Sequence, residues 1–458
     1  MQGMWKTILL VLCLVGAVSL CAASAVSKAA KEAPTIARDR AALVAWNKAT
    51  LVDPYLAVGV RDPALNDRVV TLLEQWAQSF SGETVDVPAL IAEGQALIAS
   101  GCRDPLVRYC TGKGLLDQRQ VAEALPLLLK AEEQLADSDY PAVRKYWAAR
   151  RVANALAAAG TRDERYANMV SQAIAAFREA VAAGEFAGSE HVVVDWLMQP
   201  WFADPEARQQ VEAMARSLAV PETGWLGHVL AGLFALNDGR RIVVTKDSAE
   251  LADQRAQLLT QARASFAAAL AERPDDPVAA AAMITVVDAS DGTIAEGREW
   301  FERAIAQRFD LVAAYVRFAS LLHRRGAHDD MLALADDCLA SARYDTLVPW
   351  RGVELLLQVA NARKREDGFQ VVAFWRTDDR YDAVQMALSG MLAAPEHAAI
   401  APRIAAWQAA LAAGCGDPER MKRALEQADL PVFDAILKQQ FGKDGAALRE
   451  PDEAAATP

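Results

Sequence analysis

The stretch QARASFAAALAERPDDPVAAA, residues 261–281, carries a pattern of small and large residues that decides the fold. Ala262, Phe266 and Ala269 are four and three residues apart, so a helix with 3.6 residues per turn places them in one stripe. The two alanines allow a neighbouring helix to approach, and the phenylalanine fills the space between them. The proline of ERPDDP stops this helix, and the Asp-Pro pair at 276–277 begins the next one. The stretch therefore predicts a helical hairpin.

The same pattern recurs along the chain. Gly297 follows Ala262 by 35 residues and Met331 follows Gly297 by 34, and each begins a further stripe. The three regular stripes are Ala262, Phe266 and Ala269; Gly297, Phe301 and Ala304; and Met331, Ala335 and Cys338. Weaker copies at irregular spacing begin at Ala124, Ala173 and Ala383. A period near 34 residues predicts stacked helical hairpins, each in contact mainly with its neighbours.

Residues 311–340, LVAAYVRFASLLHRRGAHDDMLALADDCLA, resemble one tetratricopeptide unit. The residues that match its first helix and its turn are Tyr315, Phe318, Ala319, Leu322 and Gly326, whereas the family's proline is missing after Cys338. Residues 295–315 are similar to the Sel1-type variant of this repeat. The stretches GCRDPLVRYC, SDYPAVRKYW and ARYDTLVPW are similar to a family of exported bacterial helical-repeat proteins. The resemblance implies an all-α fold, a right-handed α/α superhelix, or solenoid, of helical hairpins.

Helix-start signals outside the three regular stripes also favour a helical chain. Asp-Pro pairs, each able to begin a helix, occur at 53–54, 62–63, 104–105, 204–205, 276–277 and 417–418. The first two pairs lie only 9 residues apart, so one of them should be a turn. Two short β-branched runs, at 241–245 and 370–374, do not alternate with polar residues, so we interpret them as loops or helix edges.

These features predict six segments along the chain. They are a signal peptide or membrane anchor at 1–25, a linker at 26–40, an irregular helical-repeat region at 41–245, tetratricopeptide-like repeats at 246–345, a C-terminal helical region at 346–442, and a disordered tail at 443–458. The tail is assigned as disordered because it has no periodic apolar stripe.

The N-terminal segment has the features of a secretory signal peptide. Lys6 precedes an apolar run, and Ala23-Ser24-Ala25 supplies the small residues required for cleavage before Val26. The alternative is that residues 8–26 are retained and anchor the chain in the inner membrane, since about 20 apolar residues can span a bilayer. We expect cleavage, and therefore an exported protein of the periplasm or the extracellular space.

Composition and charge exclude several classes of partner. The 458 residues are 53% hydrophobic and 24% charged, which predicts a folded chain rather than a disordered one. Lys and Arg number 48 against 60 Asp and Glu, a formal net charge of −12, and the two signs are interspersed. Nucleic acid is therefore not an expected partner, and a membrane is expected only if the N-terminal segment is retained.

Cysteines and histidines provide no clear site. Cys102 and Cys110 are close in sequence, so a disulfide between them is one interpretation in an oxidising compartment. Their spacing fits no zinc motif, and Cys338 falls on a small, buried position of the third stripe. The histidines, none of them three or four residues apart, are His191, His228, His323, His328 and His397. We therefore expect no metal and no cofactor.

No catalytic motif is present, so the chain is not expected to be an enzyme. Adjacent acidic residues such as Asp275-Asp276, Asp336-Asp337 and Asp378-Asp379 imitate paired carboxylates in the sequence. Neighbouring side chains on a helix point apart, however, so capping and surface roles are expected for these acids.

Three tryptophans lie where the regular period is interrupted. Trp196 and Trp201 flank Pro200, and Trp225 follows in the next segment. One interpretation is core packing at a bend. The other is an aromatic groove for a partner, because tryptophan offers a large rigid contact area. These three residues are the candidate partner-binding residues.

Together these features predict a protein-protein interaction module or an envelope assembly scaffold. In such a module the first helices display side chains on a concave face that holds an extended peptide or a partner helix. Two alternatives stay open: an enzyme with a carboxylate-based site in an α/α array, and a membrane-anchored assembly factor. The expected partner is a protein or peptide whose identity the sequence does not specify.

Overall fold

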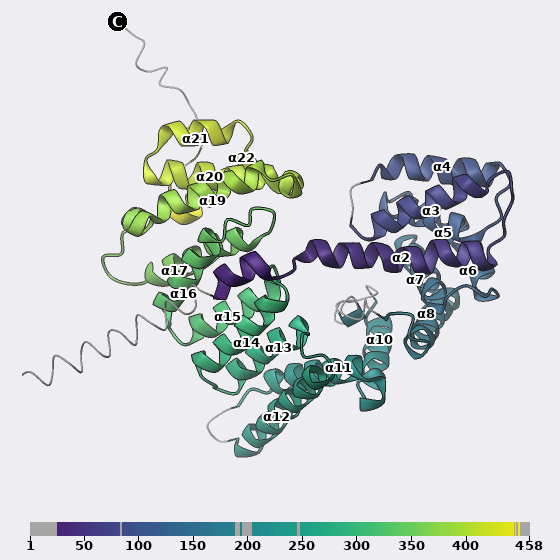
Figure 1. The fold of residues 1–458 in the computed structure, drawn as a ribbon, viewed down its shortest axis with the longest axis horizontal. Helices are drawn as coiled ribbons and strands as arrows, with labels where there is room; N and C mark the ends of the chain where they lie inside the picture. The colour runs from purple at the N-terminus through teal and green to yellow at the C-terminus, as the bar shows by residue number, and fades with distance from the viewer. Residues whose placement is uncertain are drawn as a thin grey trace, which may run out of the picture. The chain divides into compact units, whose positions relative to one another are not determined.

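The chain is all-α, as the sequence predicts. The structure is a computed structural model. It describes residues 25–82, 85–187, 193–194, 204–244 and 248–443, together with Gly445 and Leu448. These residues form helices joined by turns, with no strand among them (Figure 1). Within the same ranges, no helix is long and apolar enough to cross a membrane. The predicted leader at 1–25 and tail at 443–458 lie almost entirely outside the described residues.

The chain divides into two compact units, which are described separately. The N-terminal unit is Ile36–Arg273, and the C-terminal unit combines Met1–Thr35 with Pro274–Pro458. This division differs from the predicted segments, because its boundary falls inside the block expected at 246–345. The boundary between the two units separates the first regular stripe from the second and third stripes. The expected linker at 26–40 also differs, since most of its residues are helical.

The N-terminal unit is a series of helices in which neighbours along the chain pack together. Its helices are α2 (Ile36–Val58), α3 (Asn66–Phe80), α4 (Val87–Ala99), α5 (Pro105–Asp117), α6 (Val121–Ala136), α7 (Ala142–Ala158), α8 (Glu164–Ala182), α10 (Pro205–Leu218), η1 (Pro221–Thr223), α11 (Trp225–Arg241) and α12 (Ala249–Glu272). The long helix α2 contacts both α3 and α7 (Figure 1). Helices from distant parts of the sequence therefore meet along α2.

The C-terminal unit continues the same pattern of neighbouring helices. Its elements after the helical residues 25–32 are α13 (Pro277–Ala289), α14 (Ile294–Gln307), α15 (Val312–Arg324), α16 (His328–Ala340), α17 (Val348–Arg363), α18 (Val371–Arg376), η2 (Thr377–Asp379), α19 (Arg380–Ala393), η3 (Pro395–Ile400), α20 (Ala401–Cys415), α21 (Pro418–Leu425) and α22 (Leu430–Phe441). In both units, packing between successive helices is the arrangement expected of a solenoid of helical hairpins.

Aspartates of the Asp-Pro pairs begin several of these helices. The Asp276 carboxylate accepts hydrogen bonds from the backbone N–H groups of Val278 at 2.9 Å and Ala279 at 3.0 Å, so α13 starts where the sequence predicts. The other aspartates of these pairs that cap a helix with their side chain are Asp104, Asp204 and Asp417. The pair at 53–54 behaves differently, because Pro54 lies inside α2. The pair at 62–63 lies in the turn before α3.

The three regular stripes are buried, which confirms their predicted role in packing. Phe266 of α12 is fully buried, and its ring lies over Gly232 of α11, where an added Cβ would be 2.7 Å from the ring. Phe301 of α14 is 2% exposed and stacks on Phe318 of α15, with 4.8 Å between ring centroids. Cys338 of the third stripe is fully buried in α16. Small residues thus let the large rings seat against neighbouring helices.

Residues 25–35 pack against the C-terminal unit, although more than 200 residues separate them from it in the sequence. Val26 and Ala29 are buried, at 1% and 5% exposure. The Arg343 guanidinium donates to the Ala30 carbonyl at 2.7 Å. The backbone N–H of Phe309 donates to the carbonyl of Pro34 at 3.0 Å. Residues 26–35 of the expected linker are therefore part of the folded C-terminal unit.

Candidate functional site

Of the three tryptophans proposed from the sequence as a partner groove, Trp225 lies within the described residues. Trp225 begins α11 and is only 4% exposed, and the Arg273 guanidinium lies 4.6 Å from its ring centroid. The packing interpretation therefore replaces the binding interpretation for Trp225, because a buried ring is not accessible to a partner. Trp196 and Trp201 lie outside the described residues.

The disulfide considered from the sequence is not formed in the structure. Cys102 and Cys110 are both free, buried thiols. Cys102 lies in the turn before α5, where its backbone N–H donates to Leu97, whereas Cys110 lies on the second turn of that helix. Burial raises the pKa of Cys110 to about 12, so this thiol stays protonated and unreactive at neutral pH.

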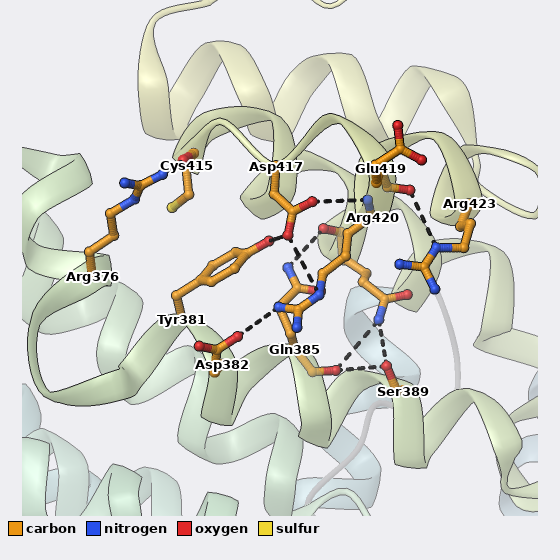
Figure 2. A network of polar contacts seen from close by, with 11 residues as sticks. Arg376, Tyr381, Asp382, Gln385, Ser389, Cys415, Asp417, Glu419, Arg420 and Arg423 are labelled. Atoms are coloured by element: carbon orange, nitrogen blue, oxygen red, sulfur yellow. Dashed lines mark hydrogen bonds and ion pairs between the residues drawn. The ribbon is translucent and has the colours of Figure 1, made fainter.

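A groove of about 710 Å³ lies between α19 and α21 in the C-terminal unit (Figure 2). The residues that line it are Asp382, Gln385, Met386, Ser389, Leu392 and Ala393 from α19, Ala405 and Gln408 from α20, and Arg420, Arg423, Ala424 and Gln427 from α21 and the turn after it. The residues from α19 are three or four positions apart, so they share one helix face. We name this feature the α19–α21 groove. Its volume is within the range of about 300 to 1,000 Å³ typical of ligand sites.

One end of the α19–α21 groove is held by a network of charged side chains (Figure 2). Tyr381 donates its hydroxyl to Asp417 at 2.8 Å, and Arg420 donates to Asp382 at 2.8 Å. Asp417 also caps α21 by accepting from the Arg420 backbone N–H at 3.1 Å. Burial opposes ionisation of Asp417, but the hydrogen bonds from Arg420 and Tyr381 lower the pKa of this carboxyl overall. The network therefore fixes α21 against α19.

The middle of the α19–α21 groove is lined by amide and hydroxyl groups. Gln385 donates to the Gln408 carbonyl at 3.2 Å, and Gln408 donates its side-chain amide to the Ser389 hydroxyl at 2.7 Å. Gln385 is 3% exposed, and its side-chain carbonyl oxygen has no hydrogen-bond donor among the described residues. A buried acceptor of this kind is costly to leave unsatisfied. Because that oxygen is buried, the accessible polar groups of this part of the groove are those of Ser389 and Gln408.

Two exposed side chains complete the α19–α21 groove. Met386 is 62% exposed, the most exposed of the large apolar residues of the C-terminal unit. Arg423 is also exposed, and its Nε donates a hydrogen bond to the Glu419 carbonyl at 3.4 Å. It forms no ion pair with any residue that the structure describes. The groove thus offers an apolar contact and an uncompensated cation near its amide groups.

The sequence analysis did not identify this groove, although it lies beside a predicted feature. Of the weaker stripe that begins at Ala383, only Ala387 is fully buried, at 1% exposure, whereas Ala383 and Gly390 lie at the edge of the buried side of α19. The polar residues Gln385 and Ser389 lie four positions apart beside that stripe, and this spacing was a usable signal. Nothing in the sequence indicated that α21 would lie opposite them.

Comparison with known proteins does not assign the chain to a family. No protein-family model matches it, and it has no significant match among curated proteins or among solved structures. In the described part of the chain, no group of three or more His, Cys, Asp or Glu side chains is arranged to hold a metal ion. The chemistry of the groove is therefore inferred from its own residues.

Proposed function

We propose that this chain is a helical-repeat interaction module that binds an extended segment of a partner protein in the α19–α21 groove. The observation that carries the proposal is the groove's combination of amide side chains with an exposed methionine and an unpaired arginine. Amide side chains can both donate to and accept from a peptide backbone, which presents both kinds of group at every residue. The side chains of Gln408 and Ser389, which bond to each other at 2.7 Å and are not buried, offer such groups to a bound peptide.

The size of the groove suits a short extended peptide. The lining residues of α19 run from Asp382 to Ala393, a helix length of about 16 Å at 1.5 Å per residue. An extended chain covers that distance with about five residues at roughly 3.3 Å each. Met386 provides a contact for one apolar side chain, and methionine adapts to different partner shapes. Arg423 favours an acidic side chain on the bound segment.

We also propose that the chain is a tetratricopeptide-like repeat protein and that it is exported. The period near 34 residues and the tetratricopeptide-like match at 311–340 support a repeat module of that kind. Lys6, the apolar run after it and the small residues before Val26 support an exported protein. In this proposal the partner is another protein of the same compartment, so the chain serves as an assembly scaffold.

A fluorescence anisotropy titration tests the groove directly. The probe is a fluorescein-labelled peptide with the sequence Gly-Glu-Leu-Glu-Leu-Gly, and its comparison peptide carries Gln in place of both Glu residues. We expect the acidic peptide to bind more tightly. Arg423→Glu should weaken its binding at least tenfold, which corresponds to about 1.4 kcal/mol, because a cation becomes an anion beside the acidic side chain.

Arg403→Glu is the matched control for this experiment. Arg403 is exposed on α20 outside the groove, so this variant makes the same change of charge without touching the lining. Its peptide affinity should equal that of the parent chain. Equal weakening by both variants, or no effect of Arg423→Glu, would show that the peptide does not bind in the groove.

A further inference from the structure

A second cavity, of about 250 Å³, lies in the N-terminal unit where four helices meet. Its lining comes from α2, α3, α5 and α7, and we name it the α2–α7 pocket. The contributing side chains of α7 are Arg144, Trp147 and Arg151, three and four positions apart on one helix face. The pocket is separate from the α19–α21 groove and was not indicated by any sequence motif.

Aromatic rings form the apolar walls of the α2–α7 pocket. Trp46 of α2, Phe80 of α3 and Trp147 of α7 all line it. Tyr109 of α5 lies beside Phe80 in an edge-on arrangement, with 6.4 Å between ring centroids. Walls of this kind favour a flat, apolar body, which can stack on one ring and meet the edge of another.

The charged side chains that line the pocket are all cationic. They are Lys113, Arg144 and Arg151. Lys113 lies 2.6 Å from the Asp117 carboxylate, and Arg151 lies 3.8 Å from the same carboxylate. Burial, followed by the charge of Arg151, lowers the pKa of the Lys113 ammonium. The Asp117 carboxylate is therefore shared by Lys113 and Arg151. A bound anion between these two cations would reduce the repulsion between them.

Arg144 is the most unusual of these cations, because it is buried without a carboxylate partner. Its side chain is 1% exposed and donates to the Thr50 carbonyl and to Asn47 Oδ1, each at 3.0 Å. Among the described residues it forms no ion pair. Burial lowers the pKa of Arg144 to about 10, so it stays charged at neutral pH. A buried charge without a direct ion pair is costly, and a ligand of opposite charge would reduce that cost.

We infer that the α2–α7 pocket binds a small aromatic carboxylate. Its anionic group would lie toward Arg144, Arg151 and Lys113, and its ring would lie against the tryptophan and phenylalanine walls. The cavity has room for roughly eight waters at about 30 Å³ each, which suits a single-ring ligand. The rings already lie beside the cations, with the Lys113 ammonium 4.6 Å from the Phe80 ring centroid, so a ligand with both an anionic group and a ring can contact both kinds of side chain. This inference does not depend on the proposed peptide groove.

Isothermal titration calorimetry of the folded chain with four probes tests the inference. The probes are benzoate, its neutral counterpart benzamide, acetate and inorganic phosphate. We expect saturable binding of benzoate with a dissociation constant below about 1 mM. Benzamide and acetate should each bind at least tenfold more weakly, because each lacks one of the two features that the pocket recognises. Phosphate should show no comparable binding.

Two variants locate the benzoate site, and a third provides the control. Arg151→Gln and Lys113→Gln each remove one cation from the lining and should weaken benzoate binding at least tenfold. Neither residue is fully buried, so both variants should keep the parent's melting temperature within a few degrees. Lys130→Gln makes the same change of charge at an exposed position of α6 and should bind benzoate like the parent chain.

The outcomes that overturn the inference are distinct. Absence of benzoate binding, or unchanged binding in both Arg151→Gln and Lys113→Gln, would show that the pocket is not the site. Equal affinity for benzamide would show that the cations do not take part. Equal affinity for acetate or phosphate would show that the aromatic walls do not recognise a ring.

Discussion

At the scale of single residues, Asp337 of α16 has the most informative environment. The sequence placed it in an adjacent acidic pair with a surface role, but the structure makes it half-buried. Its Oδ2 atom has no hydrogen-bond partner in the described part of the chain. Burial first, and then the neighbouring Asp336 carboxylate, raise the pKa of Asp337 to about 6. The folded chain therefore disfavours the ionised form of this side chain.

Asp337→Asn should stabilise the chain at neutral pH and not in acid. Because the pKa is raised in the folded state, stability falls as pH rises from about 4 to about 6, and the full penalty remains above pH 6. We expect a gain of about 1 kcal/mol at pH 7.5, less than the full shift implies because solvent screens a half-buried carboxylate. Thermal melting of both chains at pH 4, 5, 6 and 7.5 measures this difference.

Asp345→Asn provides the comparison with the opposite sign. The hydrogen bond from Arg343 lowers the pKa of Asp345, so its ionised form stabilises the fold. This variant should melt below the parent chain at pH 7.5, and the difference should shrink as the pH falls. A pH-independent gain for Asp337→Asn would show that its charge is not the cause.

At the scale of the helices, small residues determine how closely neighbours approach. An added Cβ at Gly297 of α14 would meet the Leu321 side chain of α15 at 2.2 Å. An added Cβ at Gly352 of α17 would lie 2.8 Å from the Ala335 carbonyl of α16. Both contacts involve positions of the stripes recognised in the sequence. The stripes therefore describe real helix interfaces in each unit.

Phe266→Ala tests the interface between α11 and α12. Phe266 is fully buried over Gly232, so its loss should lower the free energy of unfolding by about 3 to 5 kcal/mol. Leu251→Ala is the control on the same helix, because Leu251 is 39% exposed and leaves no cavity when it is shortened. Denaturant unfolding compares the two variants. Equal effects would contradict the packing role of the stripe.

At the scale of the whole molecule, the position of leader cleavage determines whether the N-terminal residues that pack in the C-terminal unit are kept. The sequence predicts cleavage between Ala25 and Val26. The helical residues 26–32 then begin at the mature N-terminus, and the buried Val26 side chain is kept. Cleavage at this position would therefore leave the contacts of the C-terminal unit in place.

Intact-mass measurement of the protein purified from cells distinguishes the two N-terminal hypotheses. Removal of the leader should give a chain that starts at Val26. A chain that starts at Met1 would instead support a retained anchor at 8–26. Cleavage well beyond Pro34 would contradict both, because it would remove the hydrogen bonds to Ala30 and Pro34.

The sequence by itself determined the all-α class, the buried stripes and the helix starts at Asp104, Asp204, Asp276 and Asp417. These features are local: a stripe depends on spacing within one helix, and a cap such as Asp276 bonds to residues two and three positions away. The expectation that one of the pairs at 53–54 and 62–63 is a turn holds at 62–63, whereas Pro54 lies inside α2 and does not begin a helix.

Only the tertiary structure decided where distant side chains converge. Arg144 bonds to Asn47, 97 residues away, and Arg420 of α21 bonds to Asp382 of α19, 38 residues away. It also decided that residues 25–35 complete the C-terminal unit. The physical reason is that a pocket depends on which helix faces meet after packing, and the energy of that packing is spread over many contacts between helices. No local spacing encodes such a meeting, so the groove and the pocket had no motif.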